Sequence, residues 1–414
     1  MLGIPIDFIL FGLTLLAVAL FHHHTLLVAL LGLAAITIYK LIFTGFKFGL
    51  GFTGLALHLQ HEWVLLANLF LLLMGFALLS RHFEESRIPD ELPAFLPSNW
   101  TGGFALLVIV FVLSGVLDNI AAALLGGTMA RHVFRGKVHI GYLAALVAAS
   151  NAGGAGSVLG DTTTTMMWVV GVSPLKVLGA YVAAAVALMI FGIPAARQQH
   201  KYSPIIKRAP KRLEIEWMRL TIVVAILVVA VLANVITNMK FPELLGRVPV
   251  IGLAVGVVVC ATALLRRPDW NVMPETAKGT VFLLALVVCA SMMPVEKLPS
   301  PSWQTTLSLG FVSAVFDNIP LTALALKQGG YDWGVLAFAV GFGGSMTWFG
   351  SSAGVALANI YPEARSVGSW LRHGWYVGLA YVIAFFAMLT ILGWNPDTSD
   401  RTRLTFPTLD GTSR

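Results

Sequence analysis

The sequence predicts an all-α polytopic membrane protein built from two inverted repeats, each with about five transmembrane crossings that include a re-entrant hairpin and a discontinuous helix. Three observations lead to this prediction: an apolar composition, long apolar runs and a pair of matching polar motifs. Of the 414 residues, 57% are hydrophobic and only 11% are charged, whereas soluble domains carry about 25% charged residues. This composition is typical of a chain that folds in hydrocarbon.

Apolar runs of the length needed to cross a ~30 Å hydrocarbon layer recur along the chain. They lie near 5–21, 25–43, 62–80, 173–194, 217–238, 248–265 and 375–394, with a less regular one at 275–294. The first run has no basic segment before it and no small-residue cleavage site, so we expect a retained span. Cys260 and Cys289 fall inside such runs, which predicts packing residues and no disulfide framework.

Two further stretches, 100–172 and 302–362, are apolar but interrupted by Gly, Asn, Asp, Ser and Thr. Unwound backbone at membrane depth is tolerated only where it lines a polar cavity. The two stretches also match each other. The segment SGVLDNI begins at Ser114 and SAVFDNI at Ser313, and in each stretch a Gly-Gly pair is followed six positions later by another glycine. We interpret the match as an internal duplication.

An odd number of crossings in each repeat places the two repeats in opposite orientations. We therefore predict an N-terminal repeat at 1–194, a basic cytoplasmic linker at 195–216, a C-terminal repeat at 217–394 and a polar tail at 395–414. With the linker inside the cell, the inside loops hold most of the 27 Lys and Arg residues, as the positive-inside rule requires. Both termini then face outward. Because the basic residues lie between spans, the net charge of +7 does not indicate a nucleic-acid partner.

Three carboxylates lie at the interruptions of these stretches: Asp118, Asp161 and Asp317. A charge at membrane depth costs several kcal/mol unless it faces water, a cation or a partner. Hard oxygen ligands suit Na⁺ and H⁺ and suit soft metals poorly, so we expect these three to hold a transported cation. The expected further ligands are the neighbouring amide and hydroxyl side chains: Asn119, Asn151, Thr163, Thr164, Asn318, Ser345, Ser351 and Ser352.

Simpler structural roles exist for several of these groups. Both Asp-Asn pairs are placed to cap the half-helices of the hairpin tips, and Thr164 and Thr165 are placed to bond back to the preceding turn. The run His22–His24 is expected to be interfacial rather than a metal site. The pair His61-Glu62 is expected at a span entrance, with a role as a proton-entrance group as the alternative.

At these residues the sequence resembles the NhaD-type sodium/proton antiporters, within the ion-transporter superfamily that also includes citrate, dicarboxylate and arsenite carriers. The segments SNAGGAGSVLGDTTTTMMW (150–168), SAVFDNIPL (313–321) and GGSMTWFGSSAGV (343–355) carry the resemblance. It implies a cation site drawn from both halves: Asp118, Asn119, Asn151, Asp161, Thr163, Thr164, Asp317, Asn318, Ser351 and Ser352. One departure is Gly156, where the family often has a bulkier residue such as Trp.

The expected function is secondary active Na⁺(Li⁺)/H⁺ antiport by alternating access, in the cell inner (plasma) membrane. Protons and the cation would compete for the same embedded carboxylates. The expected partners are the lipid bilayer, the small cation and the proton. No cofactor is expected, because the ion gradient supplies the free energy. The oligomeric state is left undecided between a monomer and a homodimer, since relatives in the superfamily are often dimers.

The main alternative is a Na⁺- or H⁺-coupled transporter of an organic anion such as citrate or a dicarboxylate, against which the three acidic residues argue because like charges repel. An intramembrane aspartyl protease is a remote alternative. Such enzymes carry a Gly-x-Gly-Asp motif, and residues 158–161 here are Val-Leu-Gly-Asp. The sequence has no HExxH and no Walker motif, so we expect a protein that is not an enzyme. A passive channel is the least favoured alternative.

Overall fold

The computed structural model of the protein describes residues 5–21, 24–91, 95–205, 214–241, 244 and 247–397. Most of these residues are helical, and they contain no strand beyond an isolated bridge between Phe46 and Gly49. His22 and His23, residues 206–213 of the linker and the tail from residue 398 onward lie outside the described residues. The interpretations made for them stay predictions.

Each apolar run found in the sequence forms helix. In the N-terminal half these helices are α1 (Ile6–Leu20), α2 (Thr25–Tyr39) with its π-helical continuation η1 (Lys40–Thr44), α3 (Gly51–Glu85), α9 (Pro174–Leu178) and α10 (Ala180–Tyr202). In the C-terminal half they are α11 (Trp217–Lys240), α12 (Val250–Thr262), α13 (Met273–Ser291) and α19 (Trp375–Leu392). Among the described residues, six helical segments are long and apolar enough to cross a membrane. The prediction of an all-α polytopic membrane protein is confirmed.

The interrupted stretches fold into the same order of elements. The first contains α5 (Trp100–Ser114), α6 (Asn119–Val133), α7 (Ile140–Ala155) and α8 (Thr162–Val169). The second contains α14 (Trp303–Ser313), α15 (Asn318–Gln328), α16 (Trp333–Gly343) with η6 (Gly344–Met346), and α17 (Ser352–Ile360). Short helices also occur among the described residues: α4 (Ile88–Glu91), η4 (Trp270–Val272), η5 (Val295–Lys297), η7 (Pro362–Arg365) and α18 (Val367–His373).

Helix α3 is longer than the sequence predicts. The apolar run begins near residue 62, but the helix begins at Gly51. The added turns contain His58, which is 3% exposed, because this part of the helix packs against other helices rather than lying in a loop. His61 and Glu62 consequently lie within α3, and their position at the entrance of a span stays a prediction.

The helices break where polar residues offer the backbone an alternative to the helical hydrogen bond. Asp161 and Ser351 both have extended backbones and stand directly before α8 and α17. The carboxylate of Asp161 accepts a hydrogen bond from the N–H of Thr163, and the hydroxyl of Ser351 accepts one from the N–H of Gly354. Both are therefore N-caps. Residues at equivalent positions of the two motifs thus cap the helix that follows each break.

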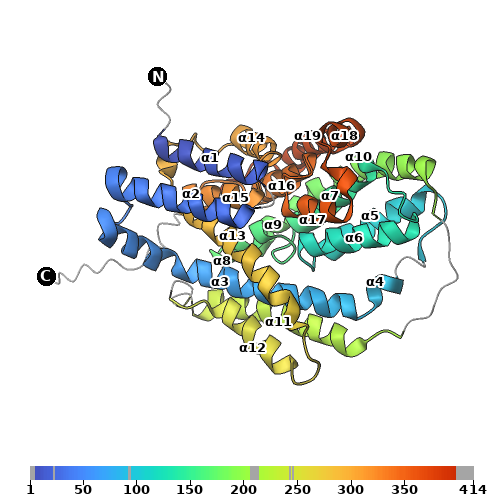
Figure 1. Ribbon diagram of the computed structural model, residues 1–414, viewed down its shortest axis with the longest axis horizontal. Helices are drawn as coiled ribbons and strands as arrows, with labels where there is room; N and C mark the ends of the chain where they lie inside the picture. The colour runs from blue at the N-terminus through green and yellow to red at the C-terminus, as the bar shows by residue number, and fades with distance from the viewer. Residues whose placement is uncertain are drawn as a thin grey trace.

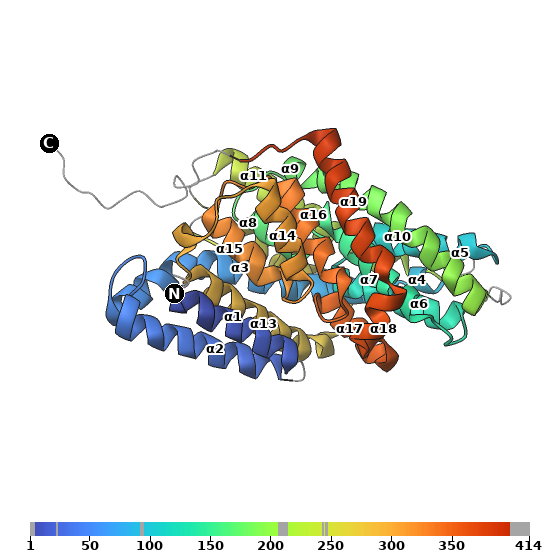
Figure 2. The same ribbon diagram turned by 90° about the horizontal axis from the view of Figure 1, so that it is seen from above.

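The two interrupted helices α7 and α16 lie side by side at the centre of the molecule (Figures 1 and 2). From Gly141 to Ala155 and from Trp333 to Gly343, every residue of these helices is buried. Helices α5, α6 and α10 pack around α7, and α14 and α19 pack against α16. A second apolar cluster joins α1, α2, α13 and part of α15. The breaks in the backbone are thus enclosed by protein.

Candidate functional site

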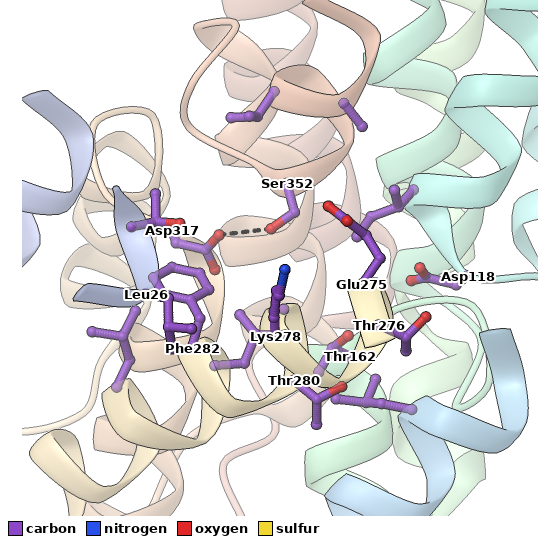
Figure 3. Close-up of a pocket in the computed structure, with 18 of the residues that line it drawn as sticks. Leu26, Asp118, Thr162, Glu275, Thr276, Lys278, Thr280, Phe282, Asp317 and Ser352 are labelled. Carbon is purple, nitrogen blue, oxygen red and sulfur yellow. Dashed lines mark hydrogen bonds between the residues drawn. The ribbon is translucent and has the colours of Figure 1, made fainter. Parts of the chain in front are cut away.

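A cavity of about 940 Å³ reaches the two hairpin turns from one side of the protein. Asp118 and Asp317 lie on opposite sides of this cavity, and side chains of α13 lie between them (Figure 3). Two of these, Glu275 and Lys278, are exposed. Thr162 and Ser352 also line the cavity, and the rest of its wall is largely apolar. The cavity therefore connects the surface of the protein to both duplicated Asp-Asn motifs.

Asp161 lies outside the cavity wall and is only 2% exposed. Its Oδ1 accepts hydrogen bonds from the N–H and the hydroxyl of Thr163, at 2.8 and 2.9 Å. Its Oδ2 accepts from the side-chain amides of Asn119 at 3.0 Å and Asn318 at 3.5 Å. All four groups are neutral donors, which suit a buried carboxylate that acts only as an acceptor. One asparagine of each duplicated motif thus donates a hydrogen bond to the same carboxylate.

Asn151 connects this carboxylate to the break in the second half. Its oxygen accepts a hydrogen bond from Asn119 at 3.1 Å, and its amide nitrogen donates to Ser345 at 2.9 Å and to Ser351 at 3.1 Å. Asn151, Ser345 and Ser351 are at most 1% exposed. The network is therefore continuous from α6 through α7 to the segment between α16 and α17.

Asp317 combines the two roles that the sequence left open. Its Oδ1 caps α15 by accepting from the N–H of Ile319 at 3.0 Å, and its Oδ2 accepts from the hydroxyl of Ser352 at 3.0 Å (Figure 3). Asp118 stands at the equivalent position before α6 and lines the cavity, but its side chain makes no capping hydrogen bond. Capping and exposure to the cavity thus occur together at Asp317.

The three carboxylates do not converge on one ion. Within the described residues, no three His, Cys, Asp or Glu side chains are close enough together to hold a metal ion. Asp161 is enclosed by amides and hydroxyls, whereas Asp118 and Asp317 face the cavity. Any cation bound here would take most of its ligands from neutral oxygens, as a hard cation can.

The threonine run divides into two roles. The hydroxyl of Thr163 reaches Asp161, as described above. The hydroxyl of Thr164 donates to the carbonyls of Ser157 and Asp161, at 2.5 and 2.8 Å. Thr165 bonds in the same way to the carbonyls of Val158 and Asp161. Both threonines therefore satisfy the backbone of the break, as the packing alternative predicted.

Sequence reasoning did not assign Glu84, Glu275 and Lys278, which line the cavity. Two charges three positions apart at the start of the run 275–294 were a signal, since they share one helix face.

The structure also explains why a glycine stands at position 156, where the related family often has a larger residue. A Cβ at Gly156 would lie 2.4 Å from the ring of Tyr181, so that ring occupies the space a larger side chain would need.

Broken helices that meet around a buried carboxylate, with a cavity leading in from one side, are the arrangement expected of a polytopic secondary transporter. The chain is 26% identical to sodium/proton antiporter 1 of Arabidopsis thaliana over 372 residues, which cover 79% of this chain and 63% of that protein. It is 25% identical to the Na⁺/H⁺ antiporter NhaD of Halomonas elongata over 364 residues, or 74% of this chain and 72% of that protein. It is also 26% identical to the NhaD of Vibrio cholerae over 406 residues, or 80% of each chain.

No family model matches the chain. These relatives nevertheless confirm the resemblance to NhaD-type sodium/proton antiporters over most of the sequence. The chain spans less than two thirds of the Arabidopsis protein and more of the bacterial ones. It is a multi-pass membrane protein related to transporters rather than to enzymes, which removes the protease alternative.

Proposed function

We propose that this protein is a secondary active transporter that exchanges Na⁺ or Li⁺ for H⁺ across the plasma membrane. The observation that carries the proposal is the buried Asp161, met by one asparagine from each duplicated motif. Its hydrogen-bond partners are all neutral, so its charge calls for a small cation or a proton. The names of the related proteins support the same exchange.

We further propose that residues 1–194 and 217–394 are inverted repeats, with α5–α6 and α14–α15 as re-entrant hairpins. Close contacts recur in both halves. A Cβ at Gly154 would lie 2.5 Å from the carbonyl oxygen of Gly160, and one at Gly344 would lie 2.6 Å from that of Gly350. Such repetition of backbone contacts supports duplication of the whole three-dimensional unit.

The hydroxyls that precede the two hairpin turns repeat as well. Ser114 donates to the carbonyl of Ser150 at 2.5 Å, and Ser313 donates to the carbonyl of Val340 at 2.7 Å. Each hairpin is thus bonded to the interrupted helix of its own half. In the proposed architecture the linker 195–216 is cytoplasmic and the tail 395–414 is polar.

The cavity opens on the side of the proposed cytoplasmic linker. Its rim includes Glu84, at the end of α3, and Glu275, at the start of α13. The same end of α3 forms ion pairs from Arg81 to Asp269 at 3.0 Å and from Glu85 to Arg219. Nearby, Arg266 holds the pKa of Glu216 below its usual value. The structure thus corresponds to an inward-facing state in the proposed topology.

In this state the carboxylates have separate tasks. Asp118 and Asp317 exchange ions and protons with the cytoplasmic cavity, and Asp161 is enclosed behind them. Because proton and cation compete for the same groups, loading one requires release of the other. Rocking of the hairpins and broken helices against α3, α11, α12 and α13 would then expose the site on the outer side.

The direct test is a proton-gradient measurement in everted vesicles that contain the purified protein. Addition of Na⁺ or Li⁺ is expected to dissipate a preformed ΔpH. Currents on solid-supported membranes should appear with these cations and not with citrate or dicarboxylates. Currents that depend on a carboxylate and not on exchange of Na⁺ for H⁺ would favour the anion-transport alternative instead.

Thr163 is expected to affect cation affinity more than its neighbours do. Thr163→Val removes one hydroxyl from Asp161, and a hydrogen bond to a charged group is worth about 1.5–3 kcal/mol. We therefore expect the KM for Na⁺ to rise by roughly tenfold or more, and Thr163→Ser to restore it. Thr221→Val is the control, because that hydroxyl bonds only to the carbonyl of Trp217 on α11. An unchanged KM in Thr163→Val would remove this residue from the site.

A further inference from the structure

A group of buried polar contacts lies at the end of α13 opposite the cavity. The ammonium of Lys327, at the end of α15, donates hydrogen bonds to the carbonyl of Ser291 and, at 2.7 Å, to the carbonyl of Met293. His58 of α3 bonds through Nε2 to the hydroxyl of Ser291 at 2.9 Å. Three helices are thus held together at the last turn of α13.

These contacts are enclosed by protein. His58 is 3% exposed, Ser291 6% and Met293 0%, and Lys327 is partly buried. The Nδ1 atom of His58 has no hydrogen-bond partner. Titratable groups from several elements act electrostatically on this cluster: Lys327, His61, Lys40 and Lys47 act on His58, and Glu62 and Glu296 act on Lys327. Of these, Lys40 is paired with Asp7 at 3.2 Å, whereas Lys327 reaches the end of α13.

The two helices joined by Lys327 both extend to the candidate site. Helix α15 begins directly after Asp317 and ends at Gln328. Helix α13 begins beside the cavity, where Glu275 and Lys278 line it, and ends at Ser291. Each helix therefore has one end at the cavity and the other at the Lys327 contacts. A movement that parts the two helices at the far end changes the geometry at the site.

We propose that Lys327 and His58 form a latch that closes the protein on the side opposite the cavity and opens in the outward-facing state. The latch is defined by Lys327, His58, Ser291 and Met293. Lys327 is a positioning residue, since it acts on the site through α13 and α15. The inference rests on the alternating access proposed above.

The physical basis is the attraction between an ammonium and the carbonyls at a helix C-terminus. The carbonyls at a helix C-terminus carry negative partial charge, and a hydrogen bond to a charged group is stronger than one between neutral groups. Two such bonds from one ammonium can favour one state and still break in a transport cycle. A population ratio shifts tenfold for every ~1.4 kcal/mol.

The test uses a single cysteine at the latch. Cys260 and Cys289 are replaced by alanine, and Met293→Cys is introduced as the reporter. A membrane-impermeant charged maleimide is added to right-side-out vesicles that contain the full chain. Lys327→Met, which keeps the length of the side chain and removes its charge, is expected to raise the labelling rate of the reporter about tenfold or more. Lys327→Arg is expected to return the rate to within about threefold of the parent.

Lys297→Met is the matched control, because Lys297 is exposed and lies in η5, close to Met293 in the sequence. It should leave the labelling rate unchanged. A second reporter, Thr276→Cys, lines the cavity and is labelled in everted vesicles. An opened latch lowers labelling there, whereas general loosening raises labelling at both positions and would overturn the inference.

If Lys327→Met does not accumulate in the membrane, His58→Leu provides the same test, since it removes the bond to Ser291 and keeps an apolar side chain against Phe46. Equal labelling of the Met293→Cys reporter in parent and variant would overturn the latch in either case. The readout does not require Na⁺ transport. Failure of the Na⁺/H⁺ exchange assay with positive labelling therefore refutes the proposed substrate, and the reverse result refutes the latch.

Discussion

Asp161→Asn is expected to reduce Na⁺-dependent proton exchange by at least about 100-fold, since a loss near 3 kcal/mol corresponds to a change of that order. The substitution removes the charge that neutral partners enclose. It also turns an acceptor into a donor opposite the amides of Asn119 and Asn318, which both donate to Oδ2. Two bonds to a charged group, each worth about 1.5–3 kcal/mol, are lost together. The measurement is ΔpH dissipation in everted vesicles at matched protein levels.

Asp332→Asn is the matched control. Asp332 caps α16 by accepting from the N–H groups of Gly334 and Val335, at 3.1 Å each, and asparagine caps a helix as well as aspartate does. This variant should retain most of the exchange activity. Full activity in Asp161→Asn would contradict the central role given to this carboxylate.

Gly153→Ala is expected to disrupt folding. A Cβ at this position in α7 would lie 2.0 Å from the carbonyl oxygen of Phe111 and 2.8 Å from its carbon, both backbone atoms of α5. Overpacking typically costs about 1–3 kcal/mol even where side chains can adjust, and here no side chain can yield. We expect the Tm of the detergent-solubilised protein to fall by at least about 5 °C. The expected yield of monodisperse protein is correspondingly low.

Gly256→Ala provides the comparison, because nothing lies within 4 Å of a Cβ placed at that glycine of α12. An alanine in an exposed helix is favoured over glycine by about 1 kcal/mol, so Tm should stay constant or rise. Equal stability of the two variants would mean that α5 and α7 are not packed as closely as described.

The sequence was a good guide to the helices and a partial guide to the site. Apolar runs and interrupting polar residues predicted the helices and their breaks, because solvation of the backbone dictates both. The start of α3 was missed, since polar residues such as His58 become compatible with a span when other helices cover them. The charges Glu275 and Lys278 were missed because a mainly apolar run concealed a face that borders water.

Motifs named the polar residues but not their partners. The duplicated Asp-Asn pairs drew attention to their aspartates, yet the asparagines are the residues that reach Asp161. Asn318 lies 157 positions from it in the sequence, and spacing alone cannot show which side chains meet at that separation. The different roles of Thr163 and Thr164 likewise depend on which way each hydroxyl turns at the start of α8.

The hydrogen-bond polarity around Asp161 has a consequence for ion loading. Asn119 and Asn318 present their N–H groups to this carboxylate, whereas a bound metal cation attracts oxygen. To coordinate the ion, each amide must rotate by about half a turn and offer its carbonyl instead. Rotation of Asn119 also breaks its bond to Asn151. Binding of the ion would therefore reorient one neutral side chain in each hairpin, and both hairpins would respond to the same event.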